Sequence, residues 1–105
     1  ENLQWLAYAE EADILNVALF GFTAKAWREA NPELAKKNNV RDFATINELT
    51  VLSNLESHNA QMIKEGKRKE ERFKILQEIA EYQLNVLNTA ERIKMLESGV
   101  KQLEM

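Results

Sequence analysis

The stretch that decides the fold is IAEYQLNVLNTAERIKMLESGVKQL, residues 79–103. Every seventh residue in it is β-branched and apolar: Ile79, Val86, Ile93 and Val100. A second set alternates with the first and completes a heptad pattern: Ile75, Tyr82, Thr89, Leu96 and Leu103. This pattern predicts one long C-terminal helix with coiled-coil character. β-Branched residues at the first seam position favour two parallel strands.

A second apolar stripe occupies another face of the same helix and stops near Ala90. Its members are Phe73, Leu76, Ala80, Leu84 and Leu87. We therefore expect residues 73–87 to pack against the chain's own helices and also against a partner. Residues 1–87 would form a helical bundle domain, and residues 88–105 would form a projecting stalk. Packing of the seam within one chain is the alternative, but it would leave the distal seam exposed to water.

The seam predicts a homodimer whose strand orientation, parallel or antiparallel, stays open. The predicted dimer interface consists of Ile75, Ile79, Tyr82, Val86, Ile93, Leu96, Val100 and Leu103. Arg92 and Glu97 would attract each other across a parallel pair, a contact that contributes less than about 1 kcal/mol when exposed. Thr89 and Gly99 weaken the seam locally.

Upstream of the seam, the sequence predicts three or four short helices packed on the base of the long one. The first should cover about residues 3–20, with Gly21 as its left-handed C-terminal cap. Its apolar positions recur at helical spacing: Trp5, Tyr8, Ala12, Leu15 and Leu19. Thr23 should cap a second helix, which ends near Ala30 because Pro32 follows.

Phe22 and Trp27 flank the start of that second helix at the spacing of a hydrophobic staple, which favours a structural role for Trp27 over a stacking site. The segment Thr45–Glu48 has the form of a capping box that opens a third helix, running to about Glu65 before Gly66. Its expected inner face consists of Leu49, Leu52, Leu55, Met62 and Ile63.

Composition supports an all-α, single-domain protein. The chain has 105 residues, of which 45% are hydrophobic and 30% charged, and only 3 glycines and 1 proline, too few for a turn-rich β fold. It has no cysteine, which excludes disulfides and thiolate metal sites and fits a reducing cytoplasm. Apolar and polar residues are mixed throughout, so no membrane span is expected. A net charge of −3 argues against autonomous nucleic-acid binding.

Candidate chemistry is sparse. His58 is the only histidine, and a lone histidine without matched ligands is rarely a metal site. Glu10, Glu11 and Asp13 lie near a helix start, where acids commonly complement the helix dipole. The chain carries no phosphate loop, nucleophile elbow or zinc-binding helix motif. We therefore expect no enzyme activity, no cofactor, no metal and no small-molecule ligand.

Two surfaces keep alternative functions open. The basic turn Lys64, Lys67, Arg68 and Lys69 could contact nucleic acid, although the interleaved acids favour a solvated face. The third helix carries an unusual polar run of Ser53, Asn54, Glu56, Ser57, His58, Asn59 and Gln61. That run could be a buried polar network or a face that binds a protein partner, while a solvated side is the favoured interpretation.

Segments EADILNVALFG, TAKAWR, ANP and RDFATINELTVLSNLE, followed by Asn59 and Ala60, resemble a known family. Over about residues 7–87 the chain resembles the C-terminal region of phage-related, Bacteroidetes-type KilA-N domain proteins. In that family an N-terminal KilA-N domain is the presumed DNA binder, and some members act as antirepressor-like regulators. We expect that residues 1–105 do not include that domain. The resemblance thus implies an accessory part of a DNA-binding protein, and it assigns no catalytic or ligand residues.

Overall fold

The computed structural model describes the backbone of residues 3–104 and the side chains of residues 3–99. Every regular element in this part of the chain is helical, which confirms the all-α class. The α-helices are α1 (Glu11–Phe20), α2 (Ala24–Ala30), α3 (Ile46–Lys64) and α4 (Lys69–Glu104). Three short 3₁₀ helices are η1 (Gln4–Ala7), η2 (Leu34–Lys36) and η3 (Val40–Phe43).

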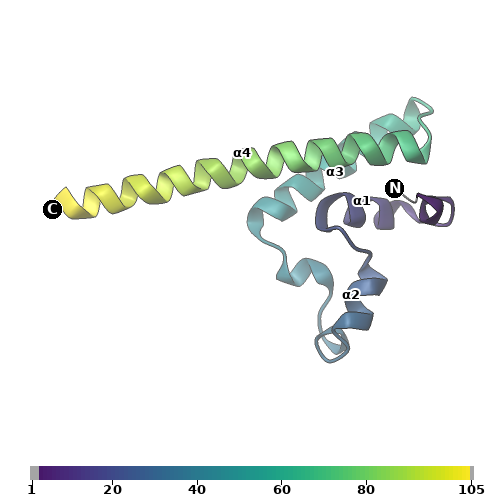
Figure 1. The fold of residues 1–105 in the computed structure, drawn as a ribbon, viewed down its shortest axis with the longest axis horizontal. Coiled ribbons are helices and arrows are strands. Elements are labelled where there is room, and N and C mark those ends of the chain that lie inside the picture. Colours follow the sequence, from purple (N-terminus) through teal and green to yellow (C-terminus); the bar gives the residue numbers. More distant parts are fainter. Residues whose placement is uncertain (1–2, 105) are drawn as a thin grey trace.

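The long helix α4 sets the shape of the molecule. Its 36 residues correspond to the longest extent of the structure, 58 Å. The radius of gyration is 17.0 Å, whereas a compact domain of this length has about 13 Å. Figure 1 shows why: α1 and α3 pack on the N-terminal half of α4, and its C-terminal half projects beyond them.

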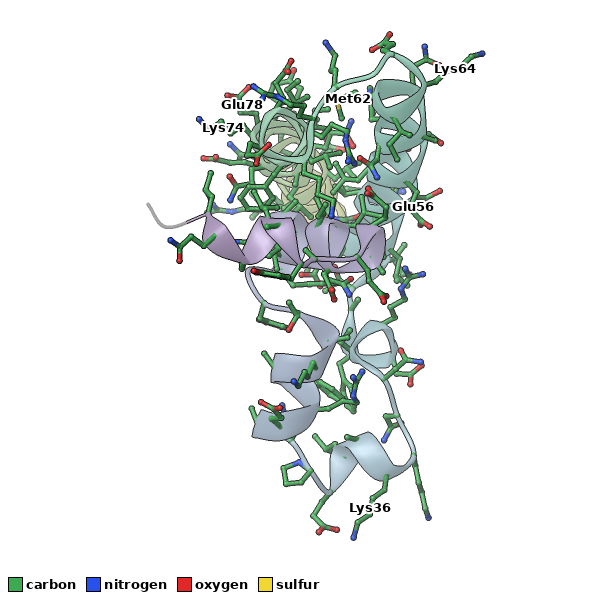
Figure 2. The ribbon with its side chains drawn as sticks, turned by 90° about the vertical axis from the view of Figure 1, so that its right-hand side faces the viewer. Lys36, Glu56, Met62, Lys64, Lys74 and Glu78 are labelled. Carbon is green, nitrogen blue, oxygen red and sulfur yellow. The ribbon has the colours of Figure 1, made fainter. Side chains whose placement is uncertain are left out.

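The core lies where α1, α3 and the N-terminal half of α4 meet. Phe73, Leu76 and Ala80 are buried, and Leu84 and Leu87 pack partly buried against the same cluster. The second apolar stripe therefore faces the chain's own helices, as predicted. Met62 fills the space between α3 and α4 (Figure 2), and α1 contributes the fully buried Ile14.

The predicted continuous first helix is wrong, because the chain breaks between η1 and α1. In a continuous helix, the N–H of Asp13 would donate to the carbonyl of Ala9. Instead it donates to Glu10 over 3.0 Å, and the Ala9 carbonyl accepts a hydrogen bond of 2.8 Å from Nζ of Lys69. A contact between residues 60 positions apart thus overrides the local helical pattern, and Tyr8 is left exposed.

The residues predicted to cap the helices are confirmed. Gly21 and Gly66 both adopt positive φ angles at the ends of α1 and α3. Thr23 accepts a hydrogen bond of 3.1 Å from the Ala26 N–H at the start of α2. The capping box of α3 is complete, since Thr45 and Glu48 each accept from the other's backbone N–H.

The predicted inner face of α3 is only partly right. Leu52, Leu55 and Met62 are buried as expected, but Leu49 and Ile63 are exposed. Val51 and Asn59 take buried positions on this helix instead. The face that α3 presents to the core is thus rotated from the predicted one, and it includes Asn59, which joins a polar network at the base of α4.

An arm made of residues 22–45 extends away from the core. Figure 2 shows α2, η2 and η3 reaching down to Lys36, at the opposite end of this view from Lys64. The Trp27 and Phe43 rings, 5.7 Å apart, join α2 to η3. Phe22 and Trp27 line one hollow at the start of the arm, but the Phe22 ring stacks on Phe20, with ring centroids 6.0 Å apart. A staple contact between Phe22 and Trp27 therefore stays a prediction.

A buried guanidinium joins three helices. Arg72, at the base of α4, is 5% exposed. It donates to both carboxylate oxygens of Glu11 on α1 and to Oδ1 of Asn59 on α3 over 2.8 Å. The Asn59 amide donates in turn to Glu11 over 2.8 Å, and Nε of Arg72 donates to the Lys67 carbonyl over 3.1 Å. The buried guanidinium therefore has the hydrogen-bond partners that a buried charge requires, and two of them, Glu11 and Asn59, are also bonded to each other.

This network also sets the acidity of Glu11. The hydrogen bond from Arg72 is the main cause that holds the pKa of the Glu11 carboxyl below its ordinary value of 4.5, and the Asn59 amide acts in the same direction. Partial burial opposes them. The folded chain therefore prefers the ionised carboxylate more strongly than the unfolded chain does.

We predict that Arg72→Met destabilises the fold by about 2 kcal/mol, because it keeps the aliphatic stem but leaves Asn59 and Glu11 without their donor. Lys36→Met is the matched control. It breaks only the exposed pair with Glu33 and should change the free energy of unfolding by less than about 0.5 kcal/mol. Urea unfolding measures both values. Equal effects of the two substitutions would contradict a central role for the network.

We predict that stability from Glu11 is complete above its ordinary pKa and is lost as the pH falls below it, because the unfolded chain takes up the proton first. Glu11→Gln removes this titration. The stability difference between the unchanged chain and the variant should therefore narrow when urea unfolding is repeated at about pH 3 instead of pH 7. A difference that stays constant over this interval would show that the carboxylate is not preferentially ionised in the fold.

Candidate dimerisation surface

The heptad seam runs from the core onto the projecting half of α4. Ile75 and Ile79 are partly buried against the core cluster. Beyond them the seam residues are open to solvent: Tyr82 is 72% exposed, Val86 49%, Ile93 52% and Leu96 61%. Their spacing of four, seven and three residues places them on one helical face. The structure thus brings together one uncharged, solvent-exposed apolar stripe on α4.

In the described part of the chain, the distal part of α4 is open to solvent, although polar contacts hold its first turn to α3. Every residue from 88 to 99 is exposed. Hydrogen bonds of 2.8 Å and 2.9 Å from the Asn47 amide to Asn88 and Glu91 tie the start of α3 to α4. The contact between α3 and α4 therefore extends one turn past the predicted start of the stalk. Val100 and Leu103 lie outside the residues whose side chains are described.

Met95 is another exposed apolar residue of α4, but its position differs. It is 68% exposed and lies two residues after Ile93, which turns it to the opposite side of the helix. The exposed apolar surface of the stalk is thus concentrated on the seam, with Met95 as an isolated exception. Arg92 and Glu97 are exposed and lie beside the seam.

A shallow groove of about 170 Å³ lies beside the seam, between α3 and α4. It is lined by Thr50, Asn54, Tyr82, Gln83, Val86 and Leu87. Asn54 donates to Gln83 over 2.9 Å and so bridges the two helices at the groove. Sequence reasoning placed Tyr82 and Val86 in the candidate interface but missed the groove that α3 forms beside them. The polar run on α3 includes Asn54 and was the one signal in the sequence for this groove. Nothing in the run predicted that Asn54 lies beside the seam of α4.

The basic turn between α3 and α4 is partly engaged within the chain. Lys69 donates to the Ala9 carbonyl, and Lys67 pairs with Glu71 at 3.9 Å. Lys64 and Arg68 are exposed. Two of the four cations predicted as possible phosphate contacts therefore have intrachain partners, which reduces the charge available to a nucleic acid.

The polar run on α3 separates into two groups in the structure. Asn59 is buried in the network with Arg72, whereas the other members of the run, His58 among them, are exposed. Glu11 belongs to this network, and the Asp13 carboxylate accepts from the Glu10 N–H at the start of α1. The acidic cluster thus has structural partners at a helix start.

In the described part of the chain, no group of three or more His, Cys, Asp or Glu residues is placed to hold a metal ion. None of the helices in that part combines the length and the apolar character that crossing a membrane requires.

A scan against protein-family models and searches of curated proteins and of solved structures find no match to this chain. The resemblance to the C-terminal region of KilA-N domain proteins therefore stays a prediction from the sequence.

Proposed function

We propose that this chain is a non-catalytic homodimerisation module whose partner surface is the seam of α4. The observation that carries the proposal is the exposed stripe of Tyr82, Val86, Ile93 and Leu96 on a helix that projects from its own core. Apolar side chains contiguous along one face are costly to leave in water. A second copy of α4 has the same heptad spacing and can cover them.

The missing packing of the projecting segment supports the same conclusion. Most of the stability of protein helices comes from packing of an apolar face rather than from intrinsic propensity, and residues 88–99 are all exposed. Pairing with a second copy would stabilise this segment through the apolar contacts that its own chain does not supply. The same contacts would join two copies of anything attached to the module.

The resemblance to KilA-N proteins gives the proposed dimer a biological setting. In it, the chain is the accessory region of a phage-related DNA-binding regulator, acting in the cytoplasm, and the DNA is contacted by a separate KilA-N domain. Dimerisation would place two such domains on one DNA site, which raises their effective concentration. It would also favour paired half-sites on the DNA.

The observed contacts give less support to the two alternative functions, which are nucleic-acid binding and binding of another protein. Direct nucleic-acid binding by the basic turn would depend mainly on Lys64 and Arg68, since Lys67 and Lys69 have intrachain partners. Binding of another protein through α3 would use its exposed polar face around Ser57 and Gln61. Both of these residues are polar, whereas large apolar and aromatic side chains dominate protein interfaces.

We predict that Ile93→Asp raises the dissociation constant of the dimer at least about a hundredfold, because it buries a carboxylate in the seam. Met95→Asp is the matched control, since it introduces the same charge on the opposite side of the same helix turn and should leave the constant within about threefold. Sedimentation equilibrium measures both constants. A dimer that survives Ile93→Asp would place the interface elsewhere.

We predict that this chain alone does not shift duplex DNA in a gel at low salt, where phosphate contacts are strongest. The control is the double variant Lys64→Glu, Arg68→Glu, which reverses the two exposed charges of the basic turn. A shift by the unchanged chain that disappears in this variant would establish direct contact through the turn and would contradict the assignment of DNA binding to a separate domain.

A further inference from the structure

The groove between α3 and α4 lies where a seam side chain of a paired α4 would insert. In a parallel, in-register coiled coil, each seam side chain enters a hole formed by four residues of the facing helix. For Tyr82 of a second copy, these four are Ile79, Tyr82, Gln83 and Val86. Three of them, all except Ile79, line the groove, and Thr50 and Asn54 of α3 extend it.

We propose that two copies pair in parallel and in register, and that the Tyr82 ring of each copy occupies the α3–α4 groove of the other. This inference rests on the proposed dimer and assigns its orientation. It also makes α3 part of the interface, so that the bundle and the stalk contact the partner together. The occupant is a second copy of this chain, because its Tyr82 belongs to the same seam that forms the groove.

The chemistry of the groove fits a tyrosine ring. Val86 and Leu87 supply apolar wall, and all six lining residues are uncharged. A buried tyrosine also needs a hydrogen-bond partner for its hydroxyl. Thr50 donates its hydroxyl to the Ile46 carbonyl, and Asn54 donates its amide N–H to Gln83. The side-chain oxygens of both residues can still accept a hydrogen bond from the phenol at the rim of the groove.

Parallel pairing also covers the distal seam better than the antiparallel register that would bring Tyr82 to the same groove. An antiparallel pair with Tyr82 opposite Val86 of the partner would bring Ile93 opposite Ile75. The same register would bring Leu96 opposite Arg72, whose guanidinium is committed to Glu11 and Asn59. In-register parallel pairing instead places Ile93 on Ile93 and Leu96 on Leu96 of the second copy, so each apolar residue meets its equivalent.

Cysteine cross-linking separates the two orientations, since the 105-residue chain has no cysteine of its own. Val86→Cys and Ile93→Cys are prepared as separate single variants of the whole chain and oxidised at micromolar concentration. Parallel, in-register pairing brings each new cysteine next to its equivalent, so both variants should form disulfide-linked dimers. In an antiparallel pair, only residues at the centre of the overlap lie next to their own equivalents. At most one of the two variants could then form a disulfide-linked dimer. A single cross-linking variant, or none, in a chain that is dimeric would overturn the parallel register.

The contact with α3 is tested by filling the groove. Thr50→Trp should raise the dissociation constant of the dimer about tenfold or more, because the added ring takes the place of the incoming tyrosine. Glu56→Trp is the control, because Glu56 is exposed, does not line the groove and lies two residues after Asn54, which turns it to the opposite side of α3. This variant should leave the constant unchanged. Tyr82→Ala should weaken the dimer to a similar extent as Thr50→Trp without affecting the fold, since this ring is exposed in the single chain.

The outcomes distinguish the inference from the function on which it rests. A stable dimer with unchanged affinity in Thr50→Trp and Tyr82→Ala would overturn the groove contact and leave dimerisation intact. A chain that stays monomeric and forms no cross-link in either cysteine variant would overturn both. Cross-linking of both cysteine variants together with weakening by Thr50→Trp, but not by Glu56→Trp, is the result that we expect.

Discussion

The position of Arg72 constrains the rest of the molecule. A buried guanidinium must keep its hydrogen-bond partners, and here these come from α1, α3 and the loop before α4. The network therefore fixes how far α4 is rotated about its own axis. Once Arg72 points inward, Phe73, Leu76 and Ala80 enter the core. Lys69, one turn earlier, reaches the Ala9 carbonyl and ends η1 before α1 begins.

The same rotation leaves the heptad seam facing outward. A helix that carries two apolar stripes can bury only one of them in a bundle as small as this one. The network selects the stripe of Phe73 and Leu76, so Tyr82, Val86, Ile93 and Leu96 are left exposed. In the proposed dimer, folding and association would use different faces of one helix. The Arg72 network is in this sense the structural basis for the proposed dimer, although it lies at the far end of α4.

Local signals in the sequence were enough for much of the fold. The capping box at Thr45, the glycines at the ends of α1 and α3 and the long proline-free heptad segment all act through neighbouring residues, which a sequence displays directly. The break before α1 and the rotation of α3 depend on Lys69 and Arg72, which look like ordinary surface bases within a charged run. The contribution of Thr50 and Asn54 to the candidate interface likewise depends on how α3 crosses α4. Such contacts between distant residues leave no periodic pattern.

The measurement that bears most directly on dimerisation through α4 is the solution mass of the unmodified chain, determined by sedimentation equilibrium across micromolar concentrations. Because the chain has a mass of 12.2 kDa, an exposed seam that pairs with its copy should give twice this value at the upper concentrations and a reversible approach to the single-chain mass on dilution. A chain that keeps the single-chain mass at every concentration would contradict the proposal that the seam binds a second copy.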